Sequence, residues 1–297
     1  MKPRVAITAG DPAGIGPEIA ITAAADPEVR ALCEPIIYGP HLPADIARFP
    51  RGQVSTSAGR AAYEAILSAV DAALAGRVDA VATAPINKEA FAAAGLPWKG
   101  HTDLLAHLTG AQRGVMMFYA DVLRVVLATV HIPLADVPRA ITRELVEEIV
   151  RLTARELPRF GHASPRIGVA GLNPHAGENG LLGHEDETVL RPAIAACLAD
   201  GVDVRGPFPA DTIFVRAMRG EFDAVIACYH DQGLIPVKMA AFGTAVNVTL
   251  GLSIIRTSVD HGTAFDIAGR GIADANSMVA AVKLAARLAA ARPTIPH

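Results

Sequence analysis

Residues 5–25 read VAITAGDPAGIGPEIAITAAA, and this stretch contains the structural unit that recurs along the chain. Val5–Thr8 is a short run of apolar and β-branched residues that predicts a strand, and Pro17–Ala25 predicts a helix. Pro17 suits the first helical turn because its φ is fixed near the helical value and no N–H is needed there. The turn between them is neither the Gly-x-Gly-x-x-Gly dinucleotide fingerprint nor a phosphate-binding loop, since no Lys-Ser/Thr pair follows it.

The alternation of strand and helix continues beyond this unit. Further strands are predicted at residues 35–38, 80–83, 125–129, 166–170 and 224–228, and helices at residues 59–75, 88–94, 144–156, 187–200 and 277–291. This alternation is typical of an α/β fold with a largely parallel sheet. Met116–Tyr119 and Leu123–Leu127 flank a short turn, which predicts an antiparallel hairpin and therefore a mixed sheet.

Composition limits the class of protein. The chain has 297 residues, a formal net charge of −3 and no Lys/Arg-rich run, so neither nucleic acid nor a membrane surface is an expected partner. Three widely separated cysteines without a Cys-x-x-Cys pair argue against a disulfide framework or a thiolate zinc site. No apolar run reaches the ~20 residues that span a membrane, and the first residues lack the apolar region of a signal peptide. We therefore expect a soluble cytoplasmic enzyme.

Three histidines each follow a predicted strand, and they are His131, His175 and His230. Ligands of open α/β sheets bind at the carboxyl ends of the strands. Three neutral imidazoles bind a divalent ion such as zinc and leave one coordination position open for a substrate. The spacing also allows three unrelated histidines that form hydrogen bonds at strand ends, because widely separated ligands carry no local signature.

Three polar residues interrupt apolar stretches near the end of the chain, and they are Lys238, Asn247 and Arg256. A charged side chain in apolar surroundings is costly unless it is paired. An anionic ligand would provide the pairing, because arginine binds phosphate or carboxylate through two parallel hydrogen bonds. The alternative is a set of internal salt bridges with Asp231, Asp260 or Asp266.

His101 and Thr102 stand at a predicted helix start, where an anion also binds favourably. Ordinary helix capping is the alternative. A second glycine-rich loop, His261–Asp274, reads HGTAFDIAGRGIAD, and its small residues allow a ligand to approach the backbone. A flexible connection would have the same composition. Because no standard Rossmann unit is present, a dehydrogenase would need a different cofactor platform.

Six motifs in this order resemble the 4-hydroxythreonine-4-phosphate dehydrogenase family, which acts in pyridoxal phosphate synthesis. They are GDPAGIGPE from Gly10, GHT from Gly100, LNPHAGE from Leu172, GPFPADT from Gly206, YHDQG from Tyr229 and RTSVDHGTA from Arg256. The resemblance implies a three-layer α/β/α fold like that of the isocitrate and isopropylmalate dehydrogenases. It also implies two lobes with the active-site cleft between them, at residues 1–100 plus 265–297 and at residues 101–264.

The resemblance assigns a role to each candidate residue. It implies that His131, His175 and His230 are the metal ligands, that His101, Thr102, Lys238, Asn247 and Arg256 bind the substrate, that His261, Gly262, Thr263, Ala264 and Asp274 bind the cofactor, and that Asp211, Asp231 and Lys238 are catalytic. The metal is zinc, magnesium, cobalt or manganese, and the cofactor is NAD or NADP. The family shares its metal site across the interface of a homodimer. The hairpin at Met116–Leu127 is a candidate for the covered edge. We expect His131 and His230 of different chains to meet at one ion, so that a mixture of His131→Ala and His230→Ala chains regains partial activity.

The implied reaction is the metal-dependent, NAD(P)-linked oxidation of 4-phosphooxy-L-threonine to 2-amino-3-oxo-4-phosphooxybutanoate, which decarboxylates to 3-amino-2-oxopropyl phosphate. Related members oxidise phosphothreonate, phosphoerythronate or a cis-dihydrodiol dicarboxylate, and these remain alternatives. A metal-dependent hydrolase without a redox cofactor is a remote alternative, because it leaves the His261 loop unexplained. The segment at residues 39–58 is shorter than expected for the family and His184 replaces another residue type, so the exact substrate stays open.

Overall fold

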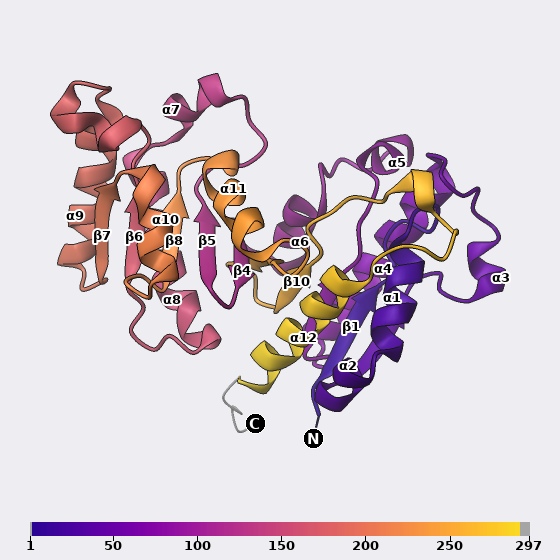
Figure 1. Ribbon diagram of the computed structural model, residues 1–297. Helices are drawn as coiled ribbons and strands as arrows, with labels where there is room; N and C mark the ends of the chain where they lie inside the picture. Colours follow the sequence, from indigo (N-terminus) through magenta and orange to yellow (C-terminus); the bar gives the residue numbers. More distant parts are fainter. Residues whose placement is uncertain (1, 292–297) are drawn as a thin grey trace. The chain divides into compact units, whose positions relative to one another are not determined.

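The computed structural model describes residues 2–291, and it confirms the predicted α/β fold with a mixed, mostly parallel arrangement of strands. The chain forms two compact units (Figure 1). The terminal unit runs to Gly114 and resumes at Val246, and the central unit is Val115–Ala245. No helix of residues 2–291 is long and apolar enough to cross a membrane.

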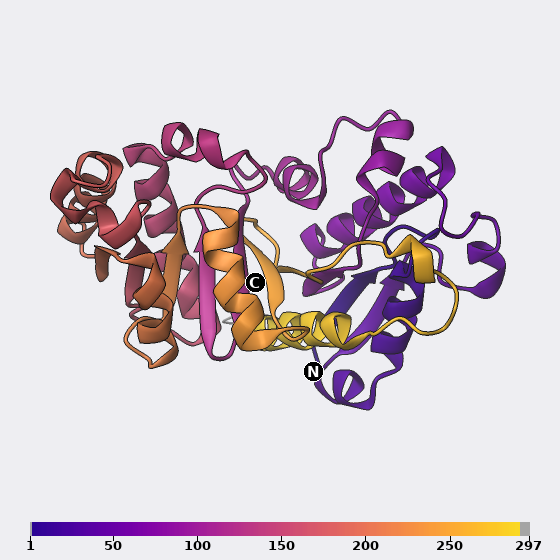
Figure 2. The ribbon, with the colours of Figure 1, turned by 45° about the horizontal axis from the view of Figure 1, so that its top comes forward.

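The terminal unit contains five strands in the order β2-β1-β3-β10-β9. Its elements are β1 Arg4–Thr8, α1 Gly16–Ala25, α2 Pro27–Leu32, β2 Glu34–Tyr38, α3 Pro43–Ile46, α4 Thr56–Leu74, β3 Ala80–Thr83, α5 Lys88–Ala93, α6 His101–Thr109, β9 Val246–Leu250, β10 Arg256–Ser258, the 3-10 turn Phe265–Ile267 and α12 Asn276–Ala290. Strands β2, β1, β3 and β10 are parallel, and β9 is antiparallel to β10. Figure 2 shows α12 (yellow) on one side of these strands and α4 (purple) on the other.

The central unit contains five strands in the order β4-β5-β8-β6-β7. Its elements are β4 Val115–Ala120, β5 Leu123–Leu127, the 3-10 turn Leu134–Asp136, α7 Val137–Ala140, α8 Arg143–Glu156, the 3-10 turn Leu157–Phe160, β6 Ile167–Ala170, the loop segment Pro174–Gly180, the π turn Asp186–Leu190, α9 Arg191–Ala199, β7 Val204–Phe208, α10 Ala210–Met218, β8 Ala224–Ala227 and α11 His230–Ala241. Strands β5, β8, β6 and β7 are parallel, so their carboxyl ends lie at one edge.

The alternation read from the sequence matches the structure at every predicted strand and helix, with ends that differ by a few residues. The predicted lobe boundaries need correction. Residues 101–114 and 246–264 belong to the terminal unit, because α6 packs against α4 and β10 pairs with β3. Strand β10 therefore extends the parallel strands of the terminal unit, and β9 follows it as an antiparallel strand.

The predicted hairpin is confirmed as β4 and β5, and its strand β5 is not an edge strand. Strand β5 has neighbours on both sides, since β4 pairs with it on one side and β8 on the other. Phe118, Leu123 and Val125 are buried in a core with the α10 and α11 side chains. Strand β5 therefore does not supply an edge that a second chain would need to cover.

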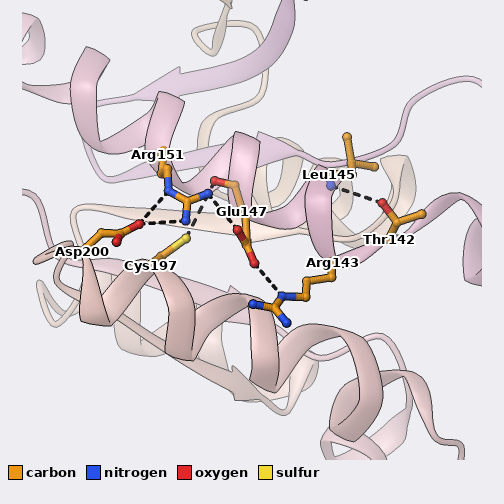
Figure 3. A network of polar contacts seen from close by, with 7 residues as sticks. All are labelled: Thr142, Arg143, Leu145, Glu147, Arg151, Cys197 and Asp200. Carbon is orange, nitrogen blue, oxygen red and sulfur yellow. Dashed lines mark hydrogen bonds and ion pairs between the residues drawn. The ribbon is translucent and has the colours of Figure 1, made fainter.

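Helices α8 and α9 are joined by a network of ion pairs (Figure 3). Arg151 donates to Asp200 at 2.8 Å and to Glu147 at 2.9 Å, and Arg143 donates to the same glutamate at 2.7 Å. The Cys197 thiol faces the Glu147 carbonyl oxygen at 3.8 Å. Because these charges are at the surface, they are screened by water and contribute little to folding.

Candidate active site

The structure brings His131 and His230 together at the carboxyl edge of the central unit. His131 lies in the connection that follows β5, and His230 begins α11 directly after β8. Because β5 and β8 are parallel neighbours, both connections leave the sheet at the same edge. The two imidazole rings lie 5.6 Å apart between centroids. They line a cavity of about 240 Å³, whose other walls include the apolar side chains of Ile132, Leu134 and Val137.

Asp231 and Lys238 stand beside His230. The His230 Nδ1 atom lies 2.6 Å from Asp231 Oδ1, so the carboxylate fixes the orientation of the ring. His230, Asp231 and Lys238 also line a second cavity of about 450 Å³ along α11. Two of the predicted catalytic residues therefore share one cavity with a predicted metal ligand.

His175 is not brought to the other two histidines. Its side chain is 67% exposed, and its Nδ1 atom lies 3.3 Å from Glu178 Oε2. It lines neither of the two cavities around His230. Among residues 2–291, no group of three or more His, Cys, Asp or Glu side chains is arranged to hold a metal ion. One chain therefore provides two of the three predicted ligands at one place.

The backbone around His175 is unusual. Residues 175–179 all have positive φ, which is a left-handed conformation that costs energy for residues other than glycine. The buried carboxylate of Asp186 holds the preceding residues by accepting hydrogen bonds from the Leu172 and Asn173 N–H groups at 2.9 and 3.1 Å. His184 lies exposed in the same region. Asp211, the remaining predicted catalytic residue, is exposed in the first turn of α10 and lines neither cavity.

Arg256 forms the centre of a separate site in the terminal unit. It is 2% exposed. Its Nε and Nη2 atoms donate to the Thr83 hydroxyl at 3.2 and 2.7 Å, and its Nη1 atom donates to the Thr249 hydroxyl at 2.8 Å. Among the described residues no carboxylate lies within ion-pair distance of it, which excludes the salt bridges considered as the alternative. Burial lowers the pKa of Arg256 to about 9.

His101 and Asn247 carry buried polar atoms without partners next to this cation. Burial lowers the pKa of His101 well below its usual value, and the charge of Arg256 lowers it further. The His101 Nε2 atom and the Asn247 Oδ1 atom have no hydrogen-bond partner within residues 2–291. Thr102 follows His101 in the first turn of α6, after the N-cap Gly100. Unpaired buried polar groups of this kind indicate that a polar ligand completes the site.

The predicted cofactor loop packs on the turn that opens the chain. The Ile15 N–H donates to the Thr263 carbonyl oxygen at 3.0 Å, and a Cβ atom on Gly14 would meet that same oxygen. Ala264 has a left-handed φ of 42°. The His261 Nε2 atom is buried without a partner in residues 2–291, whereas Asp274 accepts at 2.8 Å the N–H of Asn276, the first residue of α12. His261–Ala264 therefore form a fixed backbone surface, and Asp274 has a structural role as well.

The central unit contains some of the donor groups that a divalent ion needs. His131 and His230 offer two imidazoles on one cavity, and the Asp231 carboxylate orients one of them. Imidazole and carboxylate are ligands that zinc, cobalt and manganese accept. These two imidazoles are one fewer than the predicted set of three, because His175 lines neither cavity.

The chain is similar to known dehydrogenases over nearly its whole length. It is 46% identical to the 4-hydroxythreonine-4-phosphate dehydrogenase of Geobacter metallireducens, with 97% of this chain and 96% of that protein covered. It is 45% identical to the D-threonate 4-phosphate dehydrogenase of Cupriavidus necator, with 98% of each covered. A crystal structure of 4-hydroxythreonine-4-phosphate dehydrogenase from Klebsiella pneumoniae matches with a TM-score of 0.88 and 40% identity, covering 97% of this chain and 98% of that one. The fold and these relatives define an oxidoreductase of the dehydrogenase class.

The family model described as pyridoxal phosphate biosynthetic protein PdxA matches residues 18–285, and the chain belongs to this family. The resemblance of its motifs is thus confirmed, and the hydrolase alternative is not supported because the relatives are dehydrogenases. A likeness in fold alone extends to isocitrate dehydrogenase of Methylococcus capsulatus, at 17% identity and a TM-score of 0.50 over 93% of this chain and 82% of that one.

Sequence reasoning missed the residues that support these sites. Thr83 and Thr249 hold Arg256, and Gln232 and Asp186 hold the loops of the histidines. Thr83 is the last residue of β3, so its position at a strand end was the available signal. Its partner could not be read from the sequence, because 173 residues separate Thr83 from Arg256.

Proposed function

We propose that this chain oxidises 4-phosphooxy-L-threonine with NAD or NADP, and that the product loses CO₂ to give 3-amino-2-oxopropyl phosphate. The observation that carries the proposal is the buried Arg256 without a carboxylate partner, next to a buried neutral His101. A phosphate dianion would neutralise this cation and accept its remaining N–H groups. The names of the relatives add the class of substrate, since each acts on a 4-phosphorylated hydroxy acid.

Within this pocket we assign the contacts by donor chemistry. Arg256 retains N–H groups beyond those given to the threonine hydroxyls, because a guanidinium has five. The His101 Nε2 atom and the Asn247 side chain supply further polar contacts. Thr102, in the first turn of α6, adds a hydroxyl and an N–H at a helix start. These four residues would hold the phosphate and position the carbinol carbon.

The reaction requires a proton acceptor, and Asp231 is our candidate. A hydroxyl proton passes to Asp231, directly or through a water molecule, while hydride leaves the carbinol carbon for the nicotinamide ring. The C1–C2 bond of the resulting 3-oxo acid then breaks, and Lys238, which shares a cavity with Asp231, supplies the proton to the enol carbon. Asp211 is too exposed to be assigned a step on its own.

A divalent ion bound by His131 and His230 would lower the pKa of the substrate hydroxyl and polarise the forming ketone. We propose that His175 of the partner subunit is the third ligand of this ion. Two observations support this division: the rings of His131 and His230 already meet within one chain, and His175 is exposed and lines neither of their cavities. This opposes the division that places His131 and His230 in different chains.

The homodimer is part of the proposal, and the surface of α11 supports it. Met239 is 84% exposed, Phe242 is 82% exposed and Ile235 is 59% exposed, and Leu181 near His175 is 81% exposed. Apolar side chains that gather beside an incomplete site are expected to be covered by a second chain. An active monomer, established by light scattering at assay concentration, would contradict this assembly.

The cofactor assignment rests on the His261 loop. We propose that His261, Gly262, Thr263 and Ala264 contact the adenosine half of NAD or NADP, with Asp274 at the end of the loop. The fixed backbone of the loop and the unpaired His261 Nε2 atom support this assignment. NAD and NADP are both compatible with these residues.

The closest rival substrate is D-threonate 4-phosphate, on which the Cupriavidus relative is named to act. It carries the same phosphate, so the Arg256 site accepts both compounds. The test is cofactor reduction by the zinc- or manganese-loaded enzyme with 4-phosphooxy-L-threonine, phosphothreonate, phosphoerythronate and a cis-dihydrodiol dicarboxylate. We expect the largest kcat/KM for 4-phosphooxy-L-threonine. A larger kcat/KM for phosphothreonate would show that phosphothreonate is the substrate instead. Turnover of the unphosphorylated diol alone would contradict the assignment of Arg256 to phosphate binding.

A further inference from the structure

Gln232 joins two loops that each carry a candidate metal ligand. It lies in the first turn of α11, two residues after His230, and is 8% exposed. Its Oε1 atom accepts the Cys228 N–H at 2.6 Å, and its Nε2 atom donates to the Gly171 carbonyl oxygen at 2.7 Å. Cys228 directly follows β8 and Gly171 directly follows β6, so one side chain connects the ends of two neighbouring strands.

Cys228 also forms hydrogen bonds with Thr129, which lies in the connection between β5 and His131. Its carbonyl oxygen accepts the Thr129 hydroxyl at 2.8 Å and the Thr129 N–H at 3.2 Å. Its thiol donates to the Ala170 carbonyl oxygen at 3.4 Å. The ends of β5, β8 and β6 therefore meet at one residue, and Gln232 provides the only side-chain amide in this set of contacts.

The connection to His175 is continuous from Gly171. A Cβ atom on Gly171 would lie 2.8 Å from both the Ala176 Cα atom and the Asp186 Oδ1 atom, so the backbone is tightly enclosed there. Asp186 fixes the next two N–H groups, and the left-handed segment with His175 follows. A displacement of Gly171 would therefore be transmitted to His175, because little space is available to absorb it.

We propose that Gln232 is a positioning residue, which holds the loops of His230 and His175 in a fixed relation. Both hydrogen bonds of its amide go to backbone groups and not to an imidazole. This inference rests on the proposed histidine site, and it adds a residue that acts through the backbone. Supporting groups of metal ligands commonly change metal affinity by about 10- to 100-fold when they are altered.

The test compares two substitutions of Gln232. Gln232→Met keeps the length and apolar stem but removes both hydrogen bonds, and Gln232→Glu keeps an acceptor for the Cys228 N–H but loses the donor to Gly171. We expect faster amide hydrogen exchange at residues 171–176 of the metal-free protein in both variants. We also expect Gln232→Met to bind zinc about tenfold more weakly by titration calorimetry. Thr153→Val, which removes a buried hydrogen bond inside α8, is the matched control and should change neither quantity.

The two readouts separate this inference from the histidine site itself. If the wild-type protein binds no divalent ion, the histidine site fails, and exchange in the metal-free protein alone decides the role of Gln232. If Gln232→Met is insoluble, Thr129→Val removes the hydroxyl bond on the other side of the same peptide and should give a smaller effect in the same direction. Wild-type exchange at residues 171–176 and wild-type zinc affinity in the Gln232 variants would overturn the proposal.

Discussion

The Arg256 site and the His131–His230 site differ in how much of each is present in one chain. Arg256 is 2% exposed and already held by two threonine hydroxyls, so the site needs only a ligand. The side chains of His230 and Asp231 are 38% and 74% exposed, and the third predicted ligand points elsewhere. The Arg256 site holds a buried charge without a carboxylate partner, whereas we propose that the histidine site is completed by the partner subunit. Substitutions should therefore affect the two sites in different ways.

The largest effect is expected from Arg256→Met. Loss of a desolvated charged contact with phosphate is worth ~2–5 kcal/mol, so kcat/KM should fall by roughly 30- to 5,000-fold. The Tm should fall little, because the buried cation has no carboxylate partner to lose. Steady-state kinetics and calorimetry measure both quantities. Arg166→Met is the matched control, since Arg166 is paired with Asp223 and should lower the Tm without changing kcat/KM.

A smaller effect is expected when the support of Arg256 is changed. Thr83→Val removes the acceptor of two guanidinium N–H groups of Arg256. These two groups then have only the ligand as a hydrogen-bond acceptor. A hydrogen bond to a charged group contributes ~1.5–3 kcal/mol, so KM should rise by about tenfold or more while kcat changes less. Thr83→Ser keeps the hydroxyl and should restore KM. Equal KM values for the valine and serine variants would show that the hydroxyl does not orient Arg256.

The buried state of His101 predicts a dependence of stability on pH. Its folded pKa lies well below 6.5, so the unfolded chain binds a proton in a range where the folded chain does not. Stability is therefore lost as pH falls below about 6.5, by up to ~1.4 kcal/mol per pH unit for one proton. His162, whose pKa is lowered by burial, adds to this loss. Urea denaturation should give a shallower loss for His101→Asn between about pH 6.5 and pH 5. An unchanged slope would place His101 in a normal, solvated environment.

The smallest effect is expected at the α8–α9 network of Figure 3. Arg151→Ala removes its ion pairs with the exposed Asp200 and the partly exposed Glu147, and water screens both pairs. The Tm should fall slightly at low salt and less at high salt, and kcat/KM should not change. A large loss of activity would contradict this expectation, because it would show that the α8–α9 network affects the active site.

The sequence predicts regular elements well where their hydrophobic pattern is local. Val5–Thr8 and Pro17–Ala25 were recognised because period and turn chemistry agree within a short window. Helix α11 was missed because Gly233 and Pro236 lie inside it and both disfavour a helix interior. The tertiary contacts of the first turn, including those of Gln232, compensate for them.

The sequence predicts which residues are candidates for the site, but it does not predict how they are arranged in space. The expectation that His131 and His230 of different chains meet differs from the structure, because the register of β5 and β8 brings their loops together within one chain. Nothing local to the motif around His175 indicates that its backbone turns left-handed or that its side chain is exposed. The support of Arg256 by Thr83 depends on strand pairing across most of the chain, which a single sequence does not reveal.

The most direct test of this account is complementation between inactive chains. We predict that His131→Ala chains mixed with His175→Ala chains regain about a quarter of wild-type activity, because each mixed dimer then has one intact site. His131→Ala chains mixed with His230→Ala chains should stay inactive, since both residues serve the site of their own chain. Native mass spectrometry confirms that mixed dimers have formed. Recovery in the second mixture but not in the first would contradict the assembly of the metal site from His131 and His230 of one chain and the partner's His175.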